Sequence, residues 1–190
     1  MVNNCKGLPE GYKEKFKINL QKDKKTAVLV NVFAFIIAIA LVVPIFFIWN
    51  LNSFHITEGL GFSIKCFSVA IGAILYMVLH ELVHGIFMKA YSGVKPKYGF
   101  TGMYAYAGSS AYFNKKCYII IALAPIVVWG IVLAVLQIFL PGSWSLISYI
   151  IQIMNISGAA GDIYVTAKML KCSNDILVND TGTDMTVYEP

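Results

Sequence analysis

Two histidines and a glutamate stand together in an apolar stretch of the chain. His80, Glu81 and His84 form the pattern His-Glu-x-x-His within LHELVHGIF, residues 79–87. On a helix, side chains four residues apart lie on one face, so the two imidazoles can bind one zinc ion through nitrogen. Glu81 points about 100° round the helix, from where it can take a proton from a water molecule that zinc activates. The pattern predicts two zinc ligands and a general base.

A catalytic zinc site needs a third protein ligand. Asp162, within NISGAAGDIYV, is the only acidic residue of the last apolar block of the sequence. His84 lies six residues before Ala90, and Asp162 lies eight residues before Leu170, where their blocks end. At 1.5 Å per residue, both side chains lie about 9–12 Å from the same end of their helices. We therefore predict that Asp162 is the third ligand. The alternative is a structural partner for another helix or for a lysine.

Four long apolar blocks must position these side chains. Hydrophobic residues make up 58% of the 190 residues, against about half in a soluble domain. The excess falls into residues 26–49, 62–90, 117–140 and 144–170. Each block is long enough to cross a bilayer as a helix, and Pro44 predicts a kink in the first. The sequence thus predicts an all-α membrane protein of four transmembrane helices, with a candidate small β-hairpin in the cytosolic loop between helices 2 and 3.

Lysine placement predicts the orientation. Seven lysines precede the first block and five lie in residues 89–116, whereas the loops at 50–61 and 141–143 have none. The positive-inside rule then places both termini and the 91–116 loop in the cytosol, in a multi-pass protein of the cell membrane. The regions expected are a cytosolic segment (1–25), a four-helix membrane domain (26–172) and a cytosolic tail (173–190).

Charge and cysteine content exclude other classes of protein. All 15 basic residues are lysines, which argues against nucleic-acid binding, because base and phosphate contacts favour arginine. The net charge of +5 fits membrane topology and attraction to anionic lipid. The four cysteines form no Cys-x-x-Cys pair, and we interpret them as reduced thiols. They are Cys5, Cys66, Cys117 and Cys172.

The polar residues also have a structural interpretation. The His-Glu-x-x-His group could be a hydrogen-bonded cluster between helices, although each unpaired polar group in a bilayer costs about 2–3 kcal/mol or more. Ionisable residues within membranes are functional by default. Asn155 lies two turns before Asp162 on the same face. It could bind the substrate backbone or steady an oxyanion, or it could hydrogen-bond between helices.

Residues 97–113, KYGFTGMYAYAGSSAYF, alternate aromatic and small side chains. They could form a hairpin whose edge adds a substrate strand. The alternative is a loop that tyrosines anchor at the membrane interface.

These motifs carry a resemblance. HELVHG followed by Asp162 in a glycine-rich block resembles the site-2-protease type of intramembrane zinc peptidase. The chain is similar, more closely, to a bacterial family of small membrane zincin peptidases that pairs His-Glu-x-x-His with a later SG…GD segment, here Ser157-Gly158 and Gly161-Asp162. The resemblance covers residues 26–172. It implies that His80, His84 and Asp162 bind Zn²⁺ and that Glu81 is the catalytic base.

The sequence departs from the site-2 pattern at two positions. Gly158 stands where that pattern, Asn-x-x-Pro, has proline, and Ile163 follows the aspartate where the pattern has glycine.

The function predicted is zinc-dependent hydrolysis of a peptide bond in a membrane protein or membrane-associated peptide, near the cytosolic face. The partners expected are that substrate and the lipid bilayer, with no nucleic acid. The alternative is a metal-binding but non-proteolytic membrane scaffold or immunity-type protein. A small transporter fits less well, because the chain has only four helices and one polar cluster.

Overall fold

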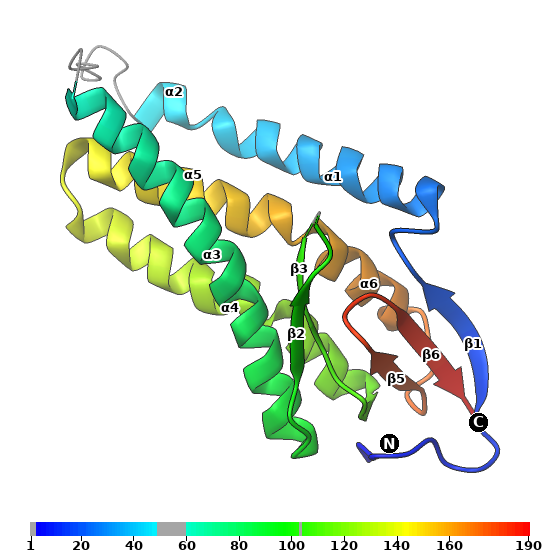
Figure 1. Ribbon diagram of the computed structural model, residues 1–190. Helices are drawn as coiled ribbons and strands as arrows, with labels where there is room; N and C mark the ends of the chain where they lie inside the picture. Colours follow the sequence, from blue (N-terminus) through cyan, green and yellow to red (C-terminus); the bar gives the residue numbers. More distant parts are fainter. Residues whose placement is uncertain (1–2, 49–59, 103) are drawn as a thin grey trace.

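The computed structural model describes residues 3–48, 60–102 and 104–190. Figure 1 shows a bundle of helices with strands gathered at one end, where both ends of the chain lie. The helices are α1 (Lys24–Val42), α2 (Ile45–Ile48), α3 (Leu60–Ser92), α4 (Lys115–Phe139), α5 (Gly142–Gly158) and α6 (Ala160–Leu170). The strands are β1 (Lys13–Ile18), β2 (Lys97–Phe100), β3 (Ala105–Gly108), β4 (Tyr112–Asn114), β5 (Leu177–Asp180) and β6 (Met185–Glu189).

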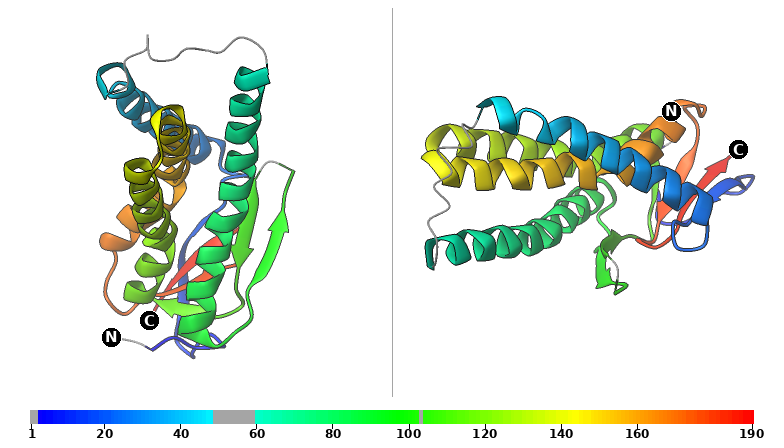
Figure 2. Two further views of the ribbon diagram at one scale, coloured as in Figure 1. Left: turned by 90° about the vertical axis from the view of Figure 1, so that its left-hand side faces the viewer. Right: turned by 90° about the horizontal axis from the view of Figure 1, so that it is seen from above.

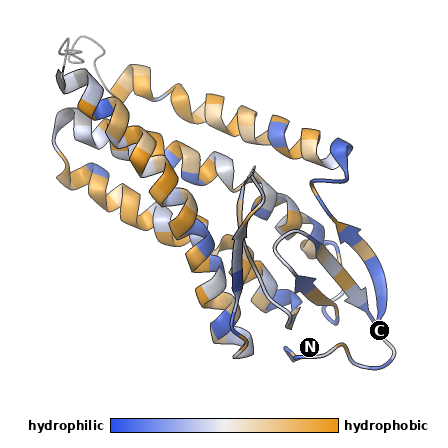
Figure 3. Cartoon of the chain, viewed as in Figure 1, coloured by the Kyte–Doolittle hydropathy of each residue, from blue (hydrophilic) through white to orange (hydrophobic). Residues whose placement is uncertain are grey.

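Within the described residues, four helical stretches are long and apolar enough to cross a membrane, as the sequence predicted. They are Lys24–Ile48, Ser63–Ser92, Lys115–Phe139 and Trp144–Leu170. A third or less of the most apolar part of each stretch is buried, so most of these side chains face outward. Figure 3 shows the hydrophobic colouring concentrated on the helices. The predicted membrane orientation stays a prediction. Residues 50–59, part of the expected external loop with His55, lie outside the described residues.

Local sequence sets where the helices begin and break. The Asp23 carboxylate accepts hydrogen bonds from the backbone N–H groups of Lys25 and Thr26 and so caps α1. The Asn114 side chain caps α4 in the same way. At Pro44, where the sequence predicted a kink, the helix is interrupted: α1 ends at Val42 and α2 begins at Ile45.

The fourth apolar block forms two helices, where the sequence predicted one. The hydroxyl of Ser157 donates to the backbone carbonyl of Ile153 at 2.7 Å. Ser-to-carbonyl bonds of this kind and Gly/Ser pairs bend helices, and α5 ends at the next residue, Gly158. Asp162 consequently lies in the first turn of α6, where the helix dipole stabilises a negative charge.

The all-α prediction is incomplete, because a four-stranded antiparallel sheet covers one end of the bundle. Its strand order is β1-β6-β5-β4, so residues from the expected N-terminal segment pair with the expected C-terminal tail. The sheet packs on the ends of α3, α4 and α6 around one buried cluster. Its fully buried members include Phe113, Ile176, Val178 and Val187.

The predicted hairpin between the second and third spans is also present. Strands β2 and β3 pair antiparallel, Lys97 with Gly108 through Phe100 with Ala105. Figure 2 shows the hairpin lying alongside α3. Gly85, the glycine of HELVHG, permits this approach, because a Cβ there would overlap the ring of Tyr98 in β2.

Candidate metal centre

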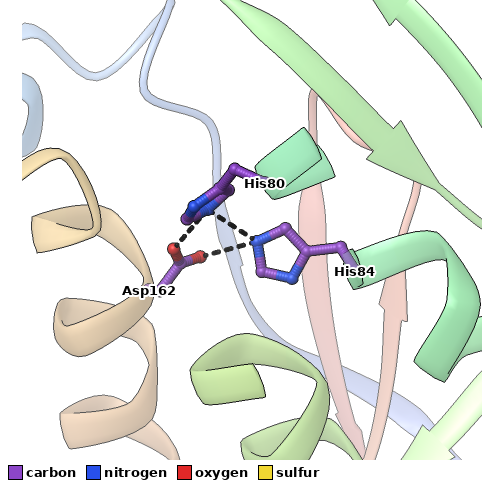
Figure 4. Close-up of side chains that lie close together, drawn as sticks. All are labelled: His80, His84 and Asp162. Carbon is purple, nitrogen blue, oxygen red and sulfur yellow. Dashed lines mark hydrogen bonds and ion pairs between the residues drawn. The ribbon is translucent and has the colours of Figure 1, made fainter. Parts of the chain in front are cut away.

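His80, His84 and Asp162 converge between α3 and α6 (Figure 4). The Nε2 atoms of His80 and His84 lie 3.2 Å apart. The Asp162 carboxylate places one oxygen 3.3 Å from Nε2 of His80 and the other 3.5 Å from Nε2 of His84. All three side chains are largely buried. The structure therefore brings together the three residues that the sequence predicted as ligands.

The protonation of the His84 ring follows from its hydrogen bond. Its Nδ1 lies 2.9 Å from the backbone carbonyl oxygen of Ile121 in α4. A carbonyl oxygen only accepts, so Nδ1 carries a proton and donates it. In the neutral ring, Nε2 is then a bare acceptor facing Asp162.

A chain of three hydrogen bonds sets the protonation of His80. The Asn155 side chain donates from Nδ2 to the Ile126 carbonyl at 3.2 Å, which turns its Oδ1 toward Tyr76. The Tyr76 hydroxyl donates to that oxygen at 3.0 Å. The same hydroxyl can then only accept from Nδ1 of His80, 2.7 Å away. When neutral, the His80 ring therefore also presents a bare Nε2.

These assignments leave three acceptors facing one another. When both rings are neutral, two bare imidazole nitrogens and a carboxylate at 3.2–3.5 Å repel unless a proton or a metal ion lies between them. Ligand atoms about 2.0–2.1 Å from a tetrahedral zinc ion lie about 3.3 Å from one another, which matches the spacing. Nitrogen and carboxylate oxygen are also donors that zinc accepts. The three side chains could hold one metal ion.

Asn155 takes the interhelical role that the sequence left open. Its side chain is fully buried, and it joins α5 to Tyr76 on α3 and to Ile126 on α4. Substrate binding by Asn155, the other interpretation, stays a prediction.

Glu81 lies beside the three acceptors, at the junction of three pockets. It is half-buried, and its carboxylate accepts a hydrogen bond from the backbone of Ala107 in β3. One pocket contains His84 and Asp162, a second contains His80, and Glu81 and Ala105 line all three. The carboxylate is therefore next to the proposed ligands and open to a bound molecule.

The comparison with protein families agrees with this arrangement. Residues 73–177, more than half of the chain, match the model of a family described as "Putative zincin peptidase". The chain belongs to this family. No curated protein and no solved structure gave a significant match.

The zincin peptidase family match contains every site residue predicted from the sequence: His80, Glu81, His84, Asn155 and Asp162. Two contributors to the site were missed. Tyr76 also lies inside the matched range, four residues before His80 on the same face of α3. That spacing was a usable signal.

Asp180, the second residue missed, lies outside the range matched to the zincin peptidase family. It ends β5 and lines the same pocket as Glu81, His84 and Asp162. Its carboxylate accepts from the Tyr118 hydroxyl at 2.6 Å and from the backbone N–H of Gly182 at 2.8 Å. Burial raises the pKa of the Asp180 carboxyl. The sequence showed it only as part of a mixed, acidic tail.

Proposed function

We propose that this protein is a zinc-dependent endopeptidase that cleaves membrane-associated substrates near the cytosolic face. One observation carries the proposal. The Nε2 atoms of two imidazoles and one carboxylate converge at 3.2–3.5 Å, with the Glu81 carboxylate beside them at an open pocket. The match of residues 73–177 to a family of zincin peptidases supports the same activity. The likeness to site-2 proteases rests on the motif alone.

Different residues of the chain have different roles in the proposed hydrolysis. Zinc, held by His80, His84 and Asp162, would supply the Lewis acidity that polarises the substrate carbonyl and activates water. The Glu81 carboxylate takes a proton from the attacking water and then delivers it to the leaving amide nitrogen. The hydrogen bonds on Nδ1 of each histidine keep both Nε2 atoms pointed at the metal position.

The hairpin offers a place for an extended substrate. The Thr101 N–H donates to the Tyr104 carbonyl, so by alternation Gly99 and Tyr106 form a hydrogen-bonded pair. The backbone groups of Ala105 and Ala107 therefore point away from β2. Because the Ala107 N–H donates to Glu81, the groups of Ala105 are the ones open to a substrate. A substrate strand that pairs with this edge would expose its carbonyls, which a helical substrate hides in its own hydrogen bonds.

An apolar pocket that Glu81 helps to line supports the proposal of a membrane substrate. It has a volume of about 710 Å³ and lies between α3 and the hairpin. Its lining includes Ile74, Met77, Val78, Leu82, Tyr98 and Phe100. Since this part of α3 belongs to an apolar span, an apolar substrate segment could reach Glu81 from the bilayer. Lysine placement supports a cytosolic location for the strand-bearing end of the bundle.

The experiment compares the wild type with Glu81→Gln. Both are purified in detergent and incubated with an extract of bacterial membrane proteins, and new peptide termini are identified by mass spectrometry. We expect equal zinc content in the two proteins and new termini only with the wild type. Zinc-loaded wild type that generates no termini beyond those of Glu81→Gln would instead support a non-proteolytic metal-binding protein.

A further inference from the structure

Pro125 lies inside α4 and changes the hydrogen bonding of one residue of the site. In an α-helix, the N–H of each residue donates to the carbonyl four residues before it. For Pro125 that carbonyl belongs to Ile121, and proline has no N–H to give. The Ile121 carbonyl is therefore left without its helical donor.

The carbonyl that Pro125 releases is the one that His84 uses. Nδ1 of His84 lies 2.9 Å from the Ile121 oxygen. Ile121 and Pro125 are both almost fully buried, so water is a poor substitute for the missing donor. A buried carbonyl without a partner is costly, and the imidazole N–H of His84 removes that cost.

We propose that Pro125 is a positioning residue for the metal centre: by leaving the Ile121 carbonyl free, it fixes the proton of His84 on Nδ1 and so presents Nε2 to the metal. The inference rests on the proposed function in one respect, namely that a metal binds at this site. The hydrogen bond between His84 and the Ile121 carbonyl is present whether or not a metal binds. A proline that merely bends α4 would not need a metal ligand as the partner of its freed carbonyl.

The N–H can be tested separately from the shape of the side chain. In Pro125→Ala, the new backbone N–H shares the Ile121 carbonyl oxygen with His84 and, by drawing it back into the helical hydrogen bond, weakens the bond to His84. Replacement of Pro125 by lactic acid, which places an ester at the same position, gives the methyl side chain of alanine without any N–H. The two variants are matched in size and differ at the one atom that the proposal concerns. Pro44→Ala, in the first span, is the control for loss of a membrane proline.

Two readouts are measured for each protein. The ¹⁵N chemical shifts of the histidine rings in metal-free protein report which nitrogen of His84 carries the proton. Competition with a chromophoric chelator gives the zinc affinity. For Pro125→Ala we expect His84 to populate the Nε2-protonated form and zinc affinity to fall about 10–100-fold, the usual effect of losing a hydrogen bond to a metal ligand. The lactic acid variant and Pro44→Ala should resemble the wild type.

An equal loss in the alanine and lactic acid variants, whether of zinc affinity or of folding, would overturn the proposal, because shape alone would then explain Pro125. No change in either variant would overturn it as well. A wild type that binds no zinc would contradict the proposed function instead, and the histidine shifts would still decide the role of Pro125.

Discussion

The hydroxyl of Tyr76 lies 2.7 Å from Nδ1 of His80, one helical turn away on the same face of α3. Through this contact, Tyr76 directly orients the ring of His80, a proposed metal ligand. Tyr76 in turn is held by Asn155, whose orientation is fixed by the Ile126 carbonyl. Both proposed histidine ligands are thus oriented through backbone carbonyls of α4, His84 directly and His80 through two side chains.

Tyr76→Phe should weaken zinc binding without unfolding the bundle. The variant removes the oxygen that accepts from Nδ1 of His80, and loss of such a partner typically lowers metal affinity 10–100-fold. Chelator competition measures the change. Tyr149→Phe is the matched control, because the Tyr149 hydroxyl donates to the Leu41 carbonyl elsewhere in the bundle. An unchanged affinity in Tyr76→Phe would show that His80 needs no support from this hydroxyl.

The purified wild type should contain about one zinc ion per chain, because one three-ligand site is present among the described residues. His80→Ala and Asp162→Ala should each lose it, since two ligands rarely hold zinc. Elemental analysis of the detergent-purified proteins measures the content. Zinc lost in His80→Ala and kept in Asp162→Ala would mean that another group is the third ligand.

Asp180→Asn should not lower the stability of the protein at neutral pH. Burial raises the pKa of the Asp180 carboxyl in the folded protein, so ionisation of this group favours the unfolded chain. The cost is absent at pH values below the unfolded pKa of about 3.9. It grows as the pH rises toward the folded pKa and stays constant above it.

Thermal unfolding at pH 4 and pH 7.5 tests whether ionisation of Asp180 destabilises the folded protein. The melting temperature of Asp180→Asn, relative to the wild type, should be higher at pH 7.5 than at pH 4. A relative melting temperature that falls with rising pH would contradict the assignment. Asp184→Asn is the opposite control, because a hydrogen bond from Asn19 lowers the pKa of Asp184. Its ionised form stabilises the fold, and because that stability is lost only as the pH falls through a folded pKa below the usual 3.8, this control is also measured below pH 4.

Gly85→Ala should slow peptide cleavage while zinc is retained. A Cβ at this position would overlap the end of the Tyr98 side chain, so that ring must move away and the contact that holds the β2–β3 hairpin against α3 beside Glu81 is loosened. Cleavage rate and zinc content are measured together. The double variant Gly85→Ala/Tyr98→Ala removes the overlap and should recover part of the rate. Full activity in Gly85→Ala would argue against the hairpin edge as the substrate site.

The part of the site that lies on regular helices could be predicted from the sequence. His80 and His84 follow from four-residue spacing, and Asp162 follows from matching its depth to that of His84 in helices that run the same way. Tyr76 was accessible to the same spacing argument, but a tyrosine in an apolar span has ordinary packing roles, so spacing alone did not single it out.

The rest depends on contacts between distant parts of the chain. The interruption between α5 and α6 coincides with the Ser157 hydroxyl turning back to donate to the Ile153 carbonyl, which a sequence pattern does not specify. Asp180 reaches the pocket only because β5 pairs with both β4 and β6. The alternation LVND-TG-TDMTVYE is typical of a hairpin, yet nothing local indicates that this hairpin packs beside Glu81.

The pairing of β1 with β6 also has a consequence for the order of assembly. Lys13 pairs with Glu189, a contact of very high sequence separation, and such contacts form late because long loops must close first. The three proposed ligands come from helices that can associate before the sheet is complete. Metal could therefore enter the site before the sheet is complete, and the pairing of β1 with β6 would be the last step of maturation.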